Sequence, residues 1–91
     1  MPKLVFTQGV FAGQEIELPD AALIIGRADE ANLVIEDGEI SGQHAELQPE
    51  GESWRITDLN SSNGTAINGQ RVESARLNDG DIITIGETVC T

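Results

Sequence analysis

The side chains best suited to chemistry in this chain lie in three polar loops. The longest, residues 58–65, reads Asp-Leu-Asn-Ser-Ser-Asn-Gly-Thr and is followed by a second turn, Asn68-Gly69. Gly26-Arg27 comes directly after an apolar run, and residues 41–44, Ser-Gly-Gln-His, come directly before another. Small polar side chains and the N–H donors of tight turns can converge on one ligand. If the fold brings the three loops together, they predict a binding site.

Arg27 suggests what such a site would bind. The chain has only five Lys and Arg residues, and a guanidinium between a glycine and a loop offers fixed donors that suit a phosphate or a carboxylate. Taken singly, each feature also has a simpler interpretation, because Arg27 fits a solvated surface residue and His44 fits a hydrogen-bonded structural histidine. It is the combination of Arg27, Ser41 and His44 with the polar turn that favours a site.

Catalysis and metal binding find little support in the sequence. Ser41, His44 and Asp58 supply the residue types of a hydrolytic triad, but no nucleophile elbow surrounds any serine. The acidic groups at 36–39 and 79–81 lack the alternating spacing of a calcium loop, and one histidine with one cysteine makes a poor transition-metal site. We therefore expect no enzymatic activity, no metal and no cofactor.

Composition narrows the remaining classes. The 91 residues suffice for one domain, 1–91, and their end at Thr91, directly after a short apolar run, suits a domain excised from a longer polypeptide or a small protein with an abbreviated edge. A net charge of −11 disfavours nucleic acid and anionic membranes as partners. With Cys90 as the single cysteine and no signal-peptide pattern, a reducing, cytoplasmic location is expected.

The pattern of apolar residues predicts an all-β fold. Short apolar or alternating runs recur every eight to twelve residues or so between Gly, Asn and Asp turns, as in a sandwich or barrel, and no helical stripe is sustained. The expected strands are 4–7, 15–18, 23–25, 33–35, 44–48, 54–57, 65–67, 71–72, 81–85 and 88–90.

Taken in order, the polar elements resemble one known family. Gly26-Arg27, Ser41-x-x-His44, the loop 58–65, Asn68-Gly69 and the closing stretch 80–86 (Gly-Asp-Ile-Ile-Thr-Ile-Gly) are similar to the motifs of the forkhead-associated (FHA) domain. Each motif is weak alone, but their order and spacing form a strong signal. The similarity runs from about Leu4 to the C-terminus.

The resemblance implies a sandwich of two mainly antiparallel sheets that binds a phosphothreonine peptide with loops at one end. By position, Arg27 and Ser41 would hold the phosphate, Ser62 would lie beside the phosphothreonine, and Asn63 would bind the peptide main chain. Supporting positions carried over from the family are Gly26, His44, Gly64 and Thr65. The implied partner is a phosphothreonine-containing protein, which a Ser/Thr kinase would produce.

Two positions depart from the family pattern. Gly42 stands where many members have Arg, Lys or Asn, so one possible phosphate or peptide contact is missing. Ser62 replaces the usual threonine but keeps the hydroxyl. Gly42 and the acidic composition motivate a second hypothesis, a phosphorylation-independent interaction or assembly domain that retains the fold. A further expectation is that Glu36, Asp37 and Glu39, just before Ser41, flank the site and favour Lys or Arg beside the phosphothreonine.

Overall fold

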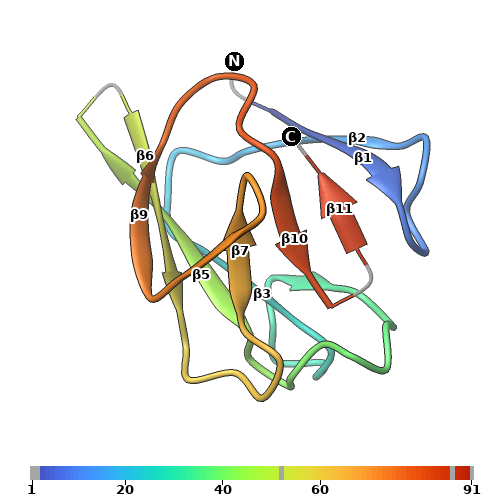
Figure 1. Cartoon of the computed structure of the whole chain (residues 1–91). Coiled ribbons are helices and arrows are strands. Elements are labelled where there is room, and N and C mark those ends of the chain that lie inside the picture. Colours follow the sequence, from blue (N-terminus) through green and yellow to red (C-terminus); the bar gives the residue numbers. More distant parts are fainter. Residues whose placement is uncertain (1–2, 52, 87, 91) are drawn as a thin grey trace.

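The computed structural model describes residues 3–51, 53–86 and 88–90, which form eleven short β-strands and no α-helix (Figure 1). In chain order the strands are β1 (Lys3–Gln8), β2 (Glu15–Glu17), β3 (Leu23–Gly26), β4 (Leu33–Val34), β5 (Ala45–Glu50), β6 (Ser53–Asp58), β7 (Thr65–Ile67), β8 (Gln70–Val72), β9 (Ser74–Leu77), β10 (Ile83–Ile85) and β11 (Thr88–Cys90). Within this described part, no helix is long and apolar enough to cross a membrane.

The strands form two sheets that pack face to face. One sheet has the order β2-β1-β11-β10-β7-β8 and the other has the order β4-β3-β5-β6-β9. Every recorded pair is antiparallel except β3 with β4, which is parallel. The predicted all-β sandwich of two mainly antiparallel sheets is confirmed.

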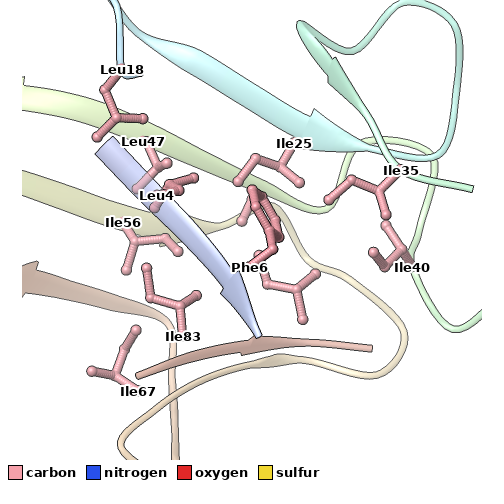
Figure 2. Packing of buried hydrophobic residues seen from close by; sticks show 12 residues of the cluster. Leu4, Phe6, Leu18, Ile25, Ile35, Ile40, Leu47, Ile56, Ile67 and Ile83 are labelled. Atoms are coloured by element: carbon pink, nitrogen blue, oxygen red, sulfur yellow. The ribbon is translucent and has the colours of Figure 1, made fainter. Parts of the chain in front are cut away.

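Alternation along the strands places the core between the sheets. In β1, Leu4 and Phe6 are buried while the residues between and beside them are less so, as a period of two requires. Figure 2 shows these two side chains among Ile25 and Leu47 of one sheet and Ile83 of the other. Full burial of such a side chain contributes about 1.5–3 kcal/mol. The core is thus a single cluster that fixes the two sheets against each other.

One strand was missing from the sequence prediction. The segment β9 pairs with β6 in the register Trp54↔Leu77 and Ile56↔Ala75, which turns Ala75 and Leu77 toward the core. Its sequence, Ser-Ala-Arg-Leu, alternates over only four residues and contains no β-branched or aromatic residue, so it gives a weak strand signal and the pairing with β6 decides its structure.

Three loops meet at one end of the sandwich, at the bottom of Figure 1. They are residues 27–32 after β3, residues 35–44 before β5 and residues 59–64 between β6 and β7. Main-chain hydrogen bonds join them: Arg27 N–H donates to Ser41 O at 3.0 Å, and Leu59 N–H donates to His44 O at 2.8 Å. The fold therefore brings the three polar loops of the sequence together.

Candidate functional site

Gly26 allows the first two loops to touch. A Cβ atom at this position would overlap the carbonyl oxygen of Gly42, so the close approach of the two backbones requires glycine. The approach is held by hydrogen bonds on either side, from Arg27 N–H to Ser41 O and from Ala28 N–H to Gly42 O at 3.1 Å. The backbones of Arg27 and Ser41, at the end of β3 and before β5, are thereby held next to each other.

His44 links the second loop to the third. The imidazole is fully buried, its Nδ1 accepts from Ser41 N–H at 3.1 Å, and its Nε2 lies 2.8 Å from Gly64 O. Because a carbonyl oxygen only accepts, Nε2 must carry the proton and the ring is the neutral Nε2–H tautomer. Nδ1 thus holds the 35–44 loop to itself, and Nε2 joins it to the 59–64 loop.

Asp58 organises the turn that follows β6. Its Oδ1 accepts from the hydroxyls of Ser61 at 2.5 Å and Thr65 at 2.8 Å, and its Oδ2 accepts from Ser61 N–H at 3.0 Å. The Ser61 hydroxyl oxygen accepts in turn from Gly64 N–H at 2.9 Å. Partial burial raises the pKa of Asp58, but the hydrogen bonds from Ser61 and Thr65 outweigh it, and the pKa lies below its ordinary value. The carboxylate is thus a structural anion that shapes the loop.

Ser41 and Ser62 lie side by side across two loops. Ser41 Oγ accepts from Ser62 N–H at 3.0 Å, which places the two serines at the junction of the loops, while the side chain of Ser62 is exposed. Ser41, His44 and Asp58 do not form a hydrolytic triad, because His44 Nδ1 binds the main-chain N–H of Ser41 and the Ser41 hydroxyl binds Ser62 N–H instead. Ser41 Oγ can still donate its proton to a ligand oxygen.

Asn63 is oriented by Glu39. Its Nδ2 donates to Glu39 O at 2.8 Å and to Glu39 Oε2 at 3.0 Å. The carbonyl oxygen of the Asn63 amide has no hydrogen bond to the described residues, so it can accept from a ligand N–H. Sequence reasoning placed Asn63 correctly at this end of the molecule, but nothing in the sequence indicated that Glu39 would hold it.

The acidic residues before Ser41 do not act as one group. Asp37 is buried, and its Oδ1 accepts from Glu39 N–H at 2.9 Å, so it shapes the loop. Glu39 is engaged with Asn63, and Glu36 remains exposed. The expectation of three carboxylates flanking a ligand was therefore wrong for Asp37, because the turn at 37–40 needs an acceptor for its own N–H groups.

The basic side chains divide into two groups. Lys3 pairs with Glu15 at 2.8 Å, Arg55 with Glu50 at 2.6 Å, and Arg76 lies 3.8 Å from Glu50. Among the described residues, Arg27 and Arg71 have neither an ion pair nor a side-chain hydrogen bond. The N–H donors of these two guanidinium groups are therefore available to an anion.

Both unpaired arginines lie at the loop end. Arg27 is exposed beside Ser41, whereas Arg71 of β8 packs on Gly64, where a Cβ would overlap its guanidinium. Gly64 has φ of 84° and so occupies the left-handed region that favours glycine. A hollow of about 320 Å³ lies beside Arg71, between Glu39, Asn63 and Gly86. The sequence analysis missed Arg71, although it is one of only five basic residues and follows the Asn68-Gly69 turn.

A second hollow, of about 310 Å³, lies at the other end of β6. It is lined by Trp54, Leu77 and the turn at 78–81, together with Lys3. Ser53 and Trp54 at the start of β6 line this hollow, whereas Asp58 at the end of β6 leads into the 59–64 loop, so the hollow is separate from the three loops.

Comparison with known proteins decides the family. The sequence profile of the FHA domain matches residues 23–86. The chain belongs to the FHA domain family. All candidate residues, from Gly26 to Thr65, lie inside the matched range.

Relatives and solved structures agree with this family. The chain is 41% identical over 88 residues to the FHA domain-containing protein FhaB of Mycolicibacterium smegmatis. This alignment covers 96% of this chain and 57% of FhaB. The crystal structure of the FhaA FHA domain complexed with the intracellular domain of Rv3910 superimposes with a TM-score of 0.87, at 32% identity, over 97% of this chain and 94% of that one. A structure from a study of phosphothreonine-dependent FHA domain interactions gives a TM-score of 0.85, at 30% identity, over 98% and 93%. This FHA chain thus spans just over half the length of FhaB.

Proposed function

We propose that this FHA domain binds phosphothreonine in a protein partner and acts as a non-catalytic module for phosphorylation-dependent, signalling-type interactions. The observation that carries the proposal is the position of Arg27, an exposed cation with no ion pair among the described residues, whose main chain binds that of Ser41, the residue that contacts Ser62. A phosphothreonine has a charge of about −1.5 to −2 and three acceptor oxygens. Arg27, the Ser41 hydroxyl and the loop N–H groups supply matching donors.

The roles of the other residues follow from their contacts. Ser62 lies next to the phosphate position through its hydrogen bond to Ser41, and Asn63 presents an amide oxygen to the N–H of a bound peptide. Gly26, His44, Gly64 and Thr65 support these residues through backbone contact and buried hydrogen bonds. A bound peptide would then lie across residues 27, 41, 62 and 63, with its phosphate at the Arg27 end.

The net charge of −11 does not prevent anion binding. At physiological salt the Debye length is about 8 Å, so distant exposed carboxylates matter less than a direct guanidinium contact. The negative net charge does repel an anionic peptide at long range, so association with such a peptide should be slower.

Gly42 supports an alternative, in which the domain binds its partner without phosphate. No side chain at this position can reach the ligand, and the loss of one charge-assisted hydrogen bond weakens binding by about 1.5–3 kcal/mol, or about ten- to a hundredfold. If the domain does bind phosphothreonine, the phosphate contacts of Arg27 and Ser41 have to suffice without a contact from position 42.

Calorimetric titration separates the two functions. A phosphothreonine-oriented peptide library supplies the best binding sequence, which is then made with phosphothreonine and with threonine. We expect only the phosphorylated peptide to bind, and Arg27→Ala to weaken it by about ten- to a hundredfold. Arg76→Ala, which removes the same charge at the distant β9 strand, is the matched control and should change little. If phosphate adds no affinity for any library sequence, the phosphorylation-independent function is the correct one.

A further inference from the structure

The hollow beside Trp54 opens into the core at the end of the sandwich away from the three loops. The strand β6 begins with Ser53 at the top of Figure 1 and ends at the bottom, where the loops meet. Leu4, Leu18 and Ile83 line the hollow although each is only 3–5% exposed, so its floor is the core itself. Figure 2 shows Leu18 and the loop residue Ile35 at opposite ends of the core cluster. The proposed phosphothreonine site leaves this hollow unused.

The hollow results from the way the chain passes between the sheets. β9 ends at Leu77 in one sheet and β10 begins at Ile83 in the other, so residues 78–82 cross the end of the sandwich. Trp54 stands opposite Leu77 in the register of β6 and β9, and both side chains are only partly buried. The crossing turn and this apolar pair line the space above the core.

Hydrogen bonds hold the crossing turn in place without a ligand. Asp81 Oδ2 accepts from Asn78 N–H at 2.8 Å, and Asp81 N–H donates to Asn78 O at 3.0 Å. The Asn68 side chain fixes the turn from the other side, because its Nδ2 donates to Asp81 Oδ1 at 3.0 Å and its Oδ1 accepts from Ile82 N–H at 2.9 Å. The hollow is therefore preformed, as small binding sites usually are.

Three polar groups at the rim of the hollow are available to a ligand. The indole N–H of Trp54, the hydroxyl of Ser53 and the carboxylate of Asp79 have no hydrogen bond to the described residues. Asp79 is exposed, whereas Trp54 and Ser53 are half-buried. An apolar floor with a few convergent polar groups is the usual composition of a binding site.

The charge around the hollow is negative. Asp79 and Asp81 lie in its wall, and Lys3, the one basic residue that lines it, lies 2.8 Å from Glu15. Glu17 stands opposite Lys3 in the register of β1 and β2. Four carboxylates thus surround one ammonium group that is already paired. This arrangement repels a phosphate and favours a cation.

An apolar side chain next to a Lys or Arg residue fits these features. The floor removes the apolar side chain from water. A neighbouring guanidinium or ammonium group can bind the carboxylate of Asp79 and stack on the ring of Trp54. A volume of about 310 Å³ is at the lower end of the range for ligand pockets, so the hollow suits one or two side chains of a protein segment.

We propose that the hollow beside Trp54 is a second, phosphate-independent docking site for a partner protein. It binds a segment in which a large apolar residue adjoins Lys or Arg: the apolar side chain enters between Leu18, Trp54 and Leu77, and the cation binds Asp79. Because the hollow and the three loops lie at opposite ends, one domain can hold this basic segment and a phosphothreonine segment together. The net charge of −11 attracts the basic segment at long range.

Short unphosphorylated peptides that place Leu or Phe next to Arg, in both orders, test the site. Each peptide is compared with a form that has citrulline, which has nearly the shape of Arg without its charge, and with a form that has Ser in place of the apolar residue. Amide shifts of the labelled domain give the location and the dissociation constant. Asp79→Asn removes one charge at the hollow, Asp29→Asn removes the same charge in the 27–32 loop, and Ser53→Leu fills the hollow. Thermal unfolding of each variant shows that the fold is retained.

We expect at least one order of the apolar residue and Arg to shift the amides of residues 53–54 and 77–81 in a saturable way. The citrulline form should bind about three- to tenfold more weakly, and the Ser form at least about tenfold more weakly. Asp79→Asn should remove the preference for Arg over citrulline, Asp29→Asn should keep it, and Ser53→Leu should weaken every peptide.

No saturable shift at residues 53–54 and 77–81 with any peptide, or a preference for Arg that survives in Asp79→Asn, overturns the docking site. Shifts centred on residues 26–28 and 61–64 would place these peptides at the three loops and overturn it as well. None of the peptides is phosphorylated, so the docking site can fail while the phosphothreonine function stands.

Discussion

Asp58→Ala should destabilise the domain strongly, because the carboxylate organises the loop that carries Ser62 and Asn63. The side chain is only 13% exposed and accepts three hydrogen bonds, two from hydroxyl groups of buried residues. Removing it leaves the fully buried Thr65 hydroxyl without a partner and the Ser61 hydroxyl without an acceptor. Each buried unsatisfied group costs about 1–3 kcal/mol, so the sum is about 2–6 kcal/mol, a large part of the total stability of a small domain.

Urea unfolding followed by the fluorescence of Trp54, the single tryptophan, measures this loss. Thr65→Val removes one of the three hydrogen bonds without a large change of volume, and we expect a smaller loss of about 1–2 kcal/mol. Asp20→Ala removes the same charge as Asp58→Ala at an exposed site and should change stability by less than about 0.5 kcal/mol. If Asp58→Ala matches Asp20→Ala, the hydrogen-bond network does not hold the loop and the reasoning is wrong.

Three further predictions concern the same loops. The pKa of Asp58 is lower in the folded protein than in the unfolded chain, so its contribution is complete above the unfolded pKa and disappears as the pH falls through the folded one. The stability difference between wild type and Asp58→Ala should therefore narrow below about pH 4 in urea titrations, and a constant difference would contradict this. Gly26→Ala should cost about 1–3 kcal/mol, since its Cβ would overlap Gly42, whereas Gly38→Ala, with open space around it, should cost under about 0.5 kcal/mol in the same assay. Gly42→Asn is sterically allowed, because a Cβ there meets only Ala28 Cβ at 3.5 Å, and it should tighten phosphopeptide binding by about three- to thirtyfold in calorimetry. Unchanged or weaker binding by a folded Gly42→Asn would show that this position does not face the ligand.

The sequence predicted the class of fold because most strands alternate clearly. Segments such as 15–18 and 54–57 alternate apolar with polar residues, a local pattern that needs no partner strand to be recognised. The strand β9 escaped because Ser-Ala-Arg-Leu becomes a strand only through its pairing with β6. The local sequence pattern therefore predicts a strand where packing in the core requires alternation, and it does not predict a strand whose formation depends on pairing with a neighbouring strand.

The sequence predicted which loops carry the candidate residues, but not the contacts that hold those residues in place. Arg27, Ser41, Ser62 and Asn63 stood out by residue type and order. The contacts that hold them join residues about 20 positions apart, such as His44 with Gly64 and Asn63 with Glu39, and depend on how the loops meet. Arg71 was missed for the same reason, because only the β7–β8 pairing and the glycine at 64 bring it to the loops.

A nuclear magnetic resonance titration of the labelled domain tests the central claim, that the three-loop end binds phosphothreonine. Amide shifts are followed while a phosphothreonine peptide, and then its threonine form, is added. The phosphorylated peptide should perturb the amides of residues 26–28, 41–42 and 61–64, and the threonine form should leave them unchanged. Perturbations centred instead on Trp54 and residues 78–81, or equal shifts with both peptides, would contradict the claim.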